Sequence, residues 1–131
     1  MIRCNFIAAA LLFLVPPSAS LAASSRGEQM LKLSPETRIE QRCDARAMGD
    51  VGRQHKGFKP DEFVAYAFAE PVLRGSHISA PGGAVRSNGK WYRVSYSCET
   101  SANGLEIKNF VHQLGAEVPR GEWDAHFLVP R

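Results

Sequence analysis

Two cysteines, Cys43 and Cys98, constrain this chain more than any other feature. The sequence has three cysteines, and Cys4 lies in an N-terminal segment that we expect to be removed on export. An even number of cysteines in an exported chain favours a disulfide, and this pair lacks the Cys-x-x-Cys spacing of redox or metal sites. The alternative is a pair of free or metal-binding thiols. A disulfide closing this loop is expected to stabilise the fold by about 4 kcal/mol.

The first residues have the pattern of a cleavable signal peptide. Arg3 precedes an apolar run, Phe6–Val15. Ser20 and Ala22 occupy the small-residue positions of a cleavage site, which predicts a signal peptide over residues 1–22. The run is too short to span a bilayer of about 30 Å as a helix, and an uncleaved membrane anchor is the alternative. The protein is therefore expected to be exported, either to the periplasm or out of the cell.

Beyond the signal peptide we expect a flexible leader over residues 23–32 and a single globular domain over residues 33–131. No second apolar run is long enough to cross a bilayer, so no transmembrane anchor is expected after cleavage. The formal net charge of the whole chain is only +3, and charges of both signs are interspersed. This composition argues against a nucleic acid or an anionic membrane surface as the partner.

One helix is predicted near the start of the domain. Ser34 is expected to cap it, Pro35 suits the first helical position, and Glu36 suits the positive end of the helix dipole. The helix is predicted to run to about Val51 and to end at Gly52. The arginines on its other faces are interpreted as solvent-exposed charge. Its apolar stripe, at four-residue spacing, comprises Ile39, Cys43, Ala47 and Val51.

After Lys56 the pattern changes to the alternation typical of β-strands. Asn88-Gly89 is a strong signal for a two-residue hairpin loop, and Pro81-Gly82-Gly83 indicates a bulge. We therefore expect an α+β fold, with one N-terminal helix packed on a four-stranded antiparallel meander and one disulfide. The predicted strands are Phe63–Leu73, His77–Arg86, Lys90–Thr100 and Leu105–Leu114, and a short C-terminal helical turn or two is expected over Pro119–Phe127.

The two turns predict how the last three strands pair. The first places Arg86 opposite Trp91, and a four-residue loop at 101–104 places Cys98 opposite Ile107. Cys98 then lies on the face of the sheet that packs on the helix, where it can reach the other cysteine. This expected inner face comprises Val85, Tyr92, Val94, Tyr96, Cys98, Ile107 and Val111.

The same register predicts an outward face that could bind a partner. Trp91 lies opposite Arg86 there, placed for a cation–π contact. An apolar stripe with basic neighbours on a solvent-exposed face is typical of a binding site. The favoured alternative is that the C-terminal segment, with Trp123, Phe127 and Leu128, folds back and covers this face. The candidate face comprises Arg86, Trp91, Arg93, Phe110, His112 and Leu114.

No catalytic or metal-binding pattern stands out in the sequence. The four histidines are scattered without the spacing of zinc ligands, so neither a metal nor a cofactor is expected. No serine lies in a nucleophile elbow, and the glycines after Pro81 lack the context of a phosphate-binding loop. Asp61 and Glu62 are adjacent only along the chain, and nothing indicates the cleft that paired catalytic carboxylates need.

Several separated stretches of the domain form an ordered set of motifs: Leu33–Asp44, Lys59-Pro60-Asp61, Ala80–Tyr92, Ser97-Cys98-Glu99 and Val118–Trp123. Taken together they resemble the family catalogued as domain of unknown function nine hundred and thirty, found in Gram-negative bacteria. The resemblance covers about Leu31 to Leu128. It implies export, paired cysteines and a single domain, and it brings no established catalytic residues.

Two hypotheses of function follow. The first is a periplasmic, non-catalytic domain that binds or supports something in the cell envelope, with an envelope or other periplasmic protein as partner. The second is a small enzyme whose site is assembled around His112 and Arg93 on the outward face. A closed outward face, covered by the C-terminal segment, argues against both uses of that face.

Overall fold

The computed structural model describes residues 26–131, so the predicted signal peptide lies outside the described residues. The main helix is α2 (Pro35–Gln54), which begins as predicted. Ser34 Oγ accepts a hydrogen bond from the backbone N–H of Thr37. The helix does not end at Gly52, because a single glycine disfavours a helix by only about 1 kcal/mol. A Cβ at position 52 would lie 3.2 Å from Pro60, so the glycine also allows close packing.

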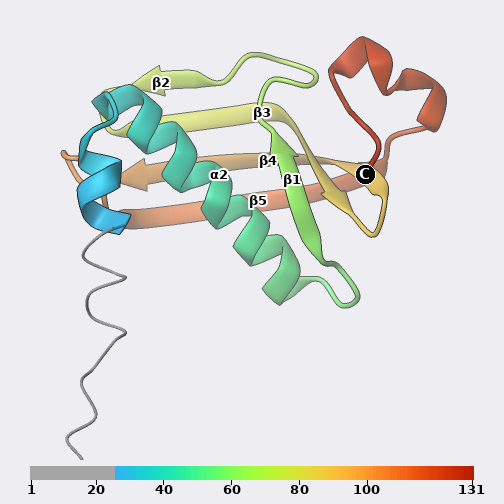
Figure 1. Cartoon of the computed structure of the whole chain (residues 1–131), viewed down its shortest axis with the longest axis horizontal. Coiled ribbons are helices and arrows are strands. Elements are labelled where there is room, and N and C mark those ends of the chain that lie inside the picture. Colours follow the sequence, from blue (N-terminus) through green and yellow to red (C-terminus); the bar gives the residue numbers. More distant parts are fainter. Residues whose placement is uncertain (1–25) are drawn as a thin grey trace, which may run out of the picture.

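Five antiparallel strands form one sheet, with the order β1-β3-β4-β5 and with β2 also paired to β3. Helix α2 crosses one face of this sheet, as Figure 1 shows. The α+β architecture predicted from the sequence is therefore confirmed, with one more strand than expected. The strands are β1 (Pro60–Val64), β2 (Val72–Arg74), β3 (His77–Ser87), β4 (Lys90–Thr100) and β5 (Ile107–Glu117).

The extra strand arises because the single strand predicted over 63–73 is divided. Strand β1 pairs with the end of β3, β2 pairs with its beginning, and residues 65–71 connect them. The connection passes over the predicted bulge in β3, where the register shifts between Ala80 and Gly83. The N–H of Phe68 donates to the carbonyl of Gly82 at 2.8 Å. A Cβ on Gly82 would lie 2.3 Å from the nitrogen of Ala69, so only glycine permits this approach.

The disulfide joins α2 to β4 as predicted, with the Cα atoms of Cys43 and Cys98 at 6.1 Å. Both cysteines are fully buried. They lie in a cluster formed by the apolar stripe of α2 and the facing residues of β3 and β4. Its members are Ile39, Cys43, Ala47, Ile78, Ala80, Tyr96 and Cys98.

The hairpin of β3 and β4 has the predicted register, with Arg86 opposite Trp91. Asn88 and Gly89 both have positive φ, at 51° and 76°, as a type I′ loop requires. The register predicted for β4 and β5 is wrong. Cys98 lies opposite Phe110 instead of Ile107.

A longer connection and an irregularity in the pairing of β4 with β5 together explain this shift. The connection spans residues 101–106, two residues more than the predicted loop, and its ends bind each other. The N–H of Ser101 donates to the carbonyl of Glu106 at 2.8 Å, and the N–H of Glu106 donates to Ser101 Oγ at 3.1 Å. The pairing also slips by one residue next to the turn, because Thr100 lies opposite Ile107 whereas Glu99 lies opposite Asn109. The longer loop alone would move the register by an even number of residues, and this slip makes the total odd, which exchanges the two faces of the strand. Phe110, His112 and Leu114 therefore face α2, whereas Val111 faces outward and is 62% exposed.

The last segment contains two 3-10 turns, η1 (Arg120–Glu122) and η2 (Asp124–His126), where helical turns were predicted. It packs against the face of the sheet that α2 leaves uncovered. Trp123 and Leu128 are buried there with Trp91 and Ala84. The favoured alternative, that the C-terminal segment covers the outward face, is confirmed for this part of the face. No helix among residues 26–131 is both long enough and apolar enough to cross a membrane.

The start of the described chain is also attached to the domain. Residues 26–31, within the expected leader, are helical. The guanidinium of Arg38 donates hydrogen bonds to the carbonyls of Met30 (2.9 Å), Leu31 (3.2 Å), Leu33 (2.9 Å) and Asn103. Arg38 is 6% exposed, so the interpretation of this arginine as solvent-exposed charge is wrong.

Candidate functional site

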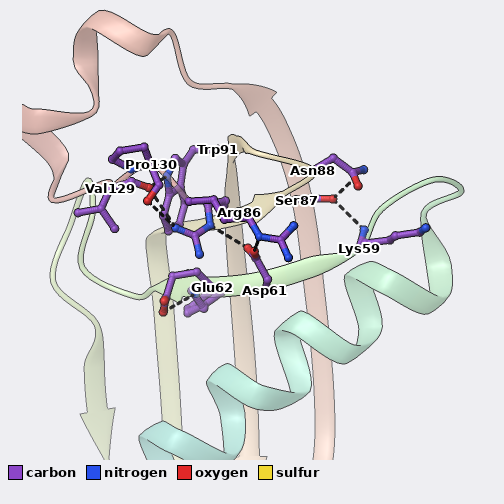
Figure 2. Close-up of polar contacts among 11 residues, drawn as sticks. Lys59, Asp61, Glu62, Arg86, Ser87, Asn88, Trp91, Val129 and Pro130 are labelled. Carbon is purple, nitrogen blue, oxygen red and sulfur yellow. Dashed lines mark hydrogen bonds and ion pairs between the residues drawn. The ribbon is translucent and has the colours of Figure 1, made fainter.

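Arg86 and Trp91, predicted to lie on an open binding face, instead hold the C-terminal segment (Figure 2). Trp91 is fully buried, and its indole N–H donates to the carbonyl of Val129 at 2.9 Å. Arg86 Nη1 donates to the carbonyls of Val129 and Pro130, each at 3.2 Å, and its Nε donates to Asp61 Oδ1 at 2.8 Å. The hydrogen bond from Arg86 holds the pKa of the Asp61 carboxyl below its usual value. These groups are occupied within the fold.

Three other members of the candidate face lie on the opposite side of the sheet. Phe110 packs against Tyr96, with ring centroids 5.4 Å apart, and Leu114 packs against the cluster of Val51, Val85 and Val94. His112 contacts His55, which follows the last residue of α2. Their placement on the helix side follows from the register of β4 and β5.

Arg93 does point outward as predicted, and its guanidinium lies 3.7 Å from the centre of the Phe68 ring. It borders a cavity of about 140 Å³ that Ser95 and Gln113 also line. Ligand sites for small molecules usually exceed about 300 Å³, so this hollow is too small for most substrates. Because His112 faces α2, the structure does not bring Arg93 and His112 together in one site.

Asp44 and Tyr96 form the most strongly perturbed titratable pair among the described residues. The phenol O–H of Tyr96 donates to Asp44 Oδ1 at 2.7 Å, between α2 and the sheet. Burial raises the pKa of Asp44 to about 6, against the lowering effect of the hydrogen bond from Tyr96. Burial and the neighbouring Asp44 also raise the pKa of Tyr96. Sequence reasoning missed this pair, although Asp44 directly follows a cysteine of the buried stripe.

The histidines at positions 55 and 112 form a second contact that the sequence did not reveal. Their Nε2 atoms lie 3.0 Å apart, and both side chains are half-buried. Burial and the neighbouring His55 lower the pKa of His112, although Asp50 acts in the opposite direction. In the part of the chain that the structure describes, no three histidine, cysteine or acidic side chains gather as a metal site.

A basic groove runs between α2 and the neighbouring strand β5. It has a volume of about 230 Å³ and is lined by Arg42, Ala45, Arg46, Gly49, Arg53 and Ile107. We call Arg42, Arg46 and Arg53 the arginine row. Asp50 binds two of its members, Arg46 at 3.1 Å and Arg53. Arg42 makes no ion pair within residues 26–131, so positive charge exceeds negative charge in this groove.

Ile107, the first residue of β5, lines this groove, and β5 is the end strand of the sheet. Within the described residues it pairs with β4 alone, so its other edge presents unpaired backbone groups. The spacing of the arginine row, at positions 42, 46 and 53, places its members on one side of a helix. That spacing was a usable signal in the sequence. The position of β5 beside the arginine row could not be recognised from the sequence, because this position depends on the tertiary fold.

The fold and this surface together define a disulfide-bonded α+β domain with an open sheet edge beside a basic groove. Residues 30–128 match the family described as Domain of Unknown Function (DUF930), and the chain belongs to this family. No curated protein and no solved structure matches the chain.

Proposed function

We propose that this chain is an exported, non-catalytic binding domain that holds an extended segment of a cell-envelope partner along the free edge of β5. One observation carries the proposal: an unpaired strand edge eleven residues long lies beside the arginine row. The disulfide and the apolar N-terminal segment support export, because disulfides persist in oxidising compartments.

The edge of β5 has the properties of a strand-addition site. An extended peptide can add to a free edge through main-chain hydrogen bonds, with pockets beside the edge selecting its side chains. Proteins usually protect long edges with charged residues, proline or a covering loop. Residues 109–116 contain no proline and no acidic, lysine or arginine side chain. Their edge is therefore open to pairing in the described structure.

The arginine row predicts the chemistry of the bound segment. Side chains of an added strand alternate between its two faces, so every second side chain would point toward α2 and the row. Within the described residues Asp50 pairs with Arg46 and Arg53, and Arg42 pairs with no carboxylate. We therefore expect the partner segment to carry acidic side chains on that face. Its other face would lie beside the exposed side chain of Val111.

A displayed library of random extended peptides tests this proposal with the oxidised protein. Wild-type protein is expected to enrich acidic sequences with alternating apolar residues, and binding should weaken as ionic strength rises. Arg42→Glu should weaken binding severalfold, because it reverses the one charge of the row that has no ion pair. Arg74→Glu, on the distant strand β2, is the matched control and should bind like the wild type.

Two outcomes would overturn the proposal. Enriched peptides that bind Arg42→Glu and wild type equally would show that the row takes no part. Dimerisation of the protein through β5, detected by sedimentation and abolished by Val111→Pro, would show that the edge serves a second copy of the chain. Thermal unfolding of Val111→Pro is the control for this measurement. A retained cooperative transition would show that the variant is folded, so that loss of the dimer could be attributed to the blocked edge.

A further inference from the structure

His112 is a titratable side chain in the middle of β5, the strand with the free edge. It lies opposite Tyr96 of β4, on the face of the sheet that packs against α2. Its imidazole meets that of His55, the capping residue of α2. The Nε2 atoms are 3.0 Å apart and the ring centroids 5.2 Å apart, so the two rings lie end to end. The two nitrogens therefore share one hydrogen bond.

The shared hydrogen bond lets this pair take up one proton but not two. In the neutral pair one Nε2 carries a hydrogen and donates it to the lone pair of the other Nε2. A proton from solvent can bind Nδ1 of the donating ring, and the hydrogen bond is then retained between an imidazolium and a neutral imidazole. A second proton would have to bind the accepting Nε2, which would place two N–H groups against each other at 3.0 Å.

We propose that the pair of His55 and His112 links binding at the β5 edge to protons, by taking up one proton when an acidic segment adds to β5. This inference rests on the proposed function and assigns a position to one acidic side chain of the bound segment. Directly opposed residues of neighbouring strands have Cβ atoms about 4.5–5.5 Å apart. A glutamate or aspartate opposite position 112, on the face toward α2, would therefore reach the imidazole and form an ion pair with its charged form.

The surroundings of the pair favour proton uptake on binding rather than before it. Burial, together with the neighbouring His55, lowers the pKa of His112 in the free protein, and the Asp50 carboxylate acts in the opposite direction. That carboxylate is already bound by two arginines of the arginine row. A carboxylate brought by the partner has no such competitor and raises the pKa of the imidazole it contacts.

Other charged and titratable groups surround the pair on α2 and β4. On α2 and β4 they are Asp44, Arg46, Asp50, Arg53, Tyr92 and Tyr96. Phe110 lies beside His112 on β5, and Phe58 contacts the His55 ring. Of the groups on α2 and β4, Asp44 has a pKa of about 6, so it also titrates in mild acid. A test of the histidine pair must therefore be controlled for Asp44.

Binding of an acidic peptide at two pH values tests the proposal. The probe is a fluorescent octapeptide of alternating glutamate and valine, whose carboxyls, with pKa values of about 4.3, remain largely charged at both. Wild type is expected to bind it about threefold or more tighter at about pH 5.5 than at about pH 8, because the bound state holds one more proton. His112→Gln should show the same affinity at both pH values.

Two control variants should keep the tighter binding in acid. Asp44→Asn removes the other buried group that titrates in this range. His126→Gln removes a histidine that contacts the carbonyl of Ala67 on the other side of the sheet. Equal tightening in wild type and His112→Gln would overturn the proposal. Affinity of the wild type that does not depend on pH would overturn it while leaving strand addition intact, and no binding at either pH would overturn both.

A proton count in the free protein does not depend on any variant folding. Nuclear magnetic resonance of the imidazole carbons, followed from about pH 8 to about pH 5, should show that the pair takes up one proton in total. Two independent titrations near the usual pKa of about 6.5 would overturn the proposal, because the rings would then share no hydrogen bond. A cooperative thermal transition in His112→Gln shows that this variant is folded in the binding experiment.

Discussion

On one face of the sheet, α2 packs a regular apolar stripe and is joined to β4 by the Cys43–Cys98 disulfide. On the other face, the C-terminal segment forms two short 3-10 turns, and side chains of the sheet bind its backbone. Helix α2 is regular and covalently attached to the sheet, whereas the C-terminal segment is irregular and is held by Arg86 and Trp91. A regular helix can be predicted from the spacing of its apolar residues. An irregular segment cannot be predicted in this way, because it depends on contacts between residues far apart in sequence.

Removing the covalent attachment should have the largest effect. The double variant Cys43→Ala/Cys98→Ala is expected to lose about 4 kcal/mol of unfolding free energy, because the disulfide closes a loop with a sequence separation of 55. Urea denaturation of oxidised wild type and the variant measures this difference. Reduced wild type is the control and should resemble the variant. A variant as stable as the oxidised protein would show that α2 needs no covalent attachment.

Weakening the irregular cover should have a smaller and more local effect. Arg86→Met removes the ion pair with Asp61 and two hydrogen bonds to the C-terminal backbone, at an expected cost of about 2 kcal/mol. Trypsin should then cleave faster at Arg120, which lies at the start of η1. Arg93→Met, on the same face of the sheet, is the control. Unchanged cleavage at Arg120 would mean that burial of Trp91 and Trp123 alone holds the segment.

The third prediction concerns the polar contact beneath α2, whose effect is seen as a change in the pH dependence of stability. The pKa of Asp44 is raised from 3.8 to about 6 in the folded protein, so the folded state binds more protons than the unfolded state between these values. The contribution of this group therefore makes stability fall as pH rises from about 4 to about 6. Asp44→Asn should remove that decline, while its side-chain oxygen still accepts the hydrogen bond from Tyr96.

Denaturation curves collected from pH 4 to pH 7 measure the decline as a difference between variant and wild type. Glu70→Gln, an exposed carboxyl in the connection between β1 and β2, is the matched control and should leave the curve unchanged. A parallel pH dependence in Asp44→Asn and wild type would contradict the assignment of the raised pKa to Asp44.

The parts of the fold that the sequence predicted correctly are specified by neighbouring residues. Ser34 and Pro35 mark the start of α2, and Asn88-Gly89 sets the pairing of β3 with β4. The division of the strand predicted over 63–73 could not be foreseen, because it depends on a bulge in a different strand. The register of β5 was equally hidden, because it depends on the longer turn closed by Ser101 and Glu106 and on the slip in pairing between Glu99 and Thr100.

The candidate site was predicted less well, for the same reason. An error of an odd number of residues in β5 moved Phe110, His112 and Leu114 to the wrong face of the sheet. Burial of Trp91 beneath the C-terminal segment was predicted as the favoured alternative. The hydrogen bonds from Arg86 to the backbone of that segment were not predicted. Contacts such as His55 with His112 arise only when the end of α2 and the middle of β5 are placed together.

Arg38 sets a limit on how short the folded chain can be. Its buried guanidinium takes three of its four carbonyl partners from residues 30–33, before the helix begins, and the fourth from Asn103 in the turn before β5. A chain beginning at the helix cap would leave this charge buried with one partner, which is costly. The cooperative unit therefore starts at about Met30, and Arg38 joins the residues that precede α2 to the turn between β4 and β5.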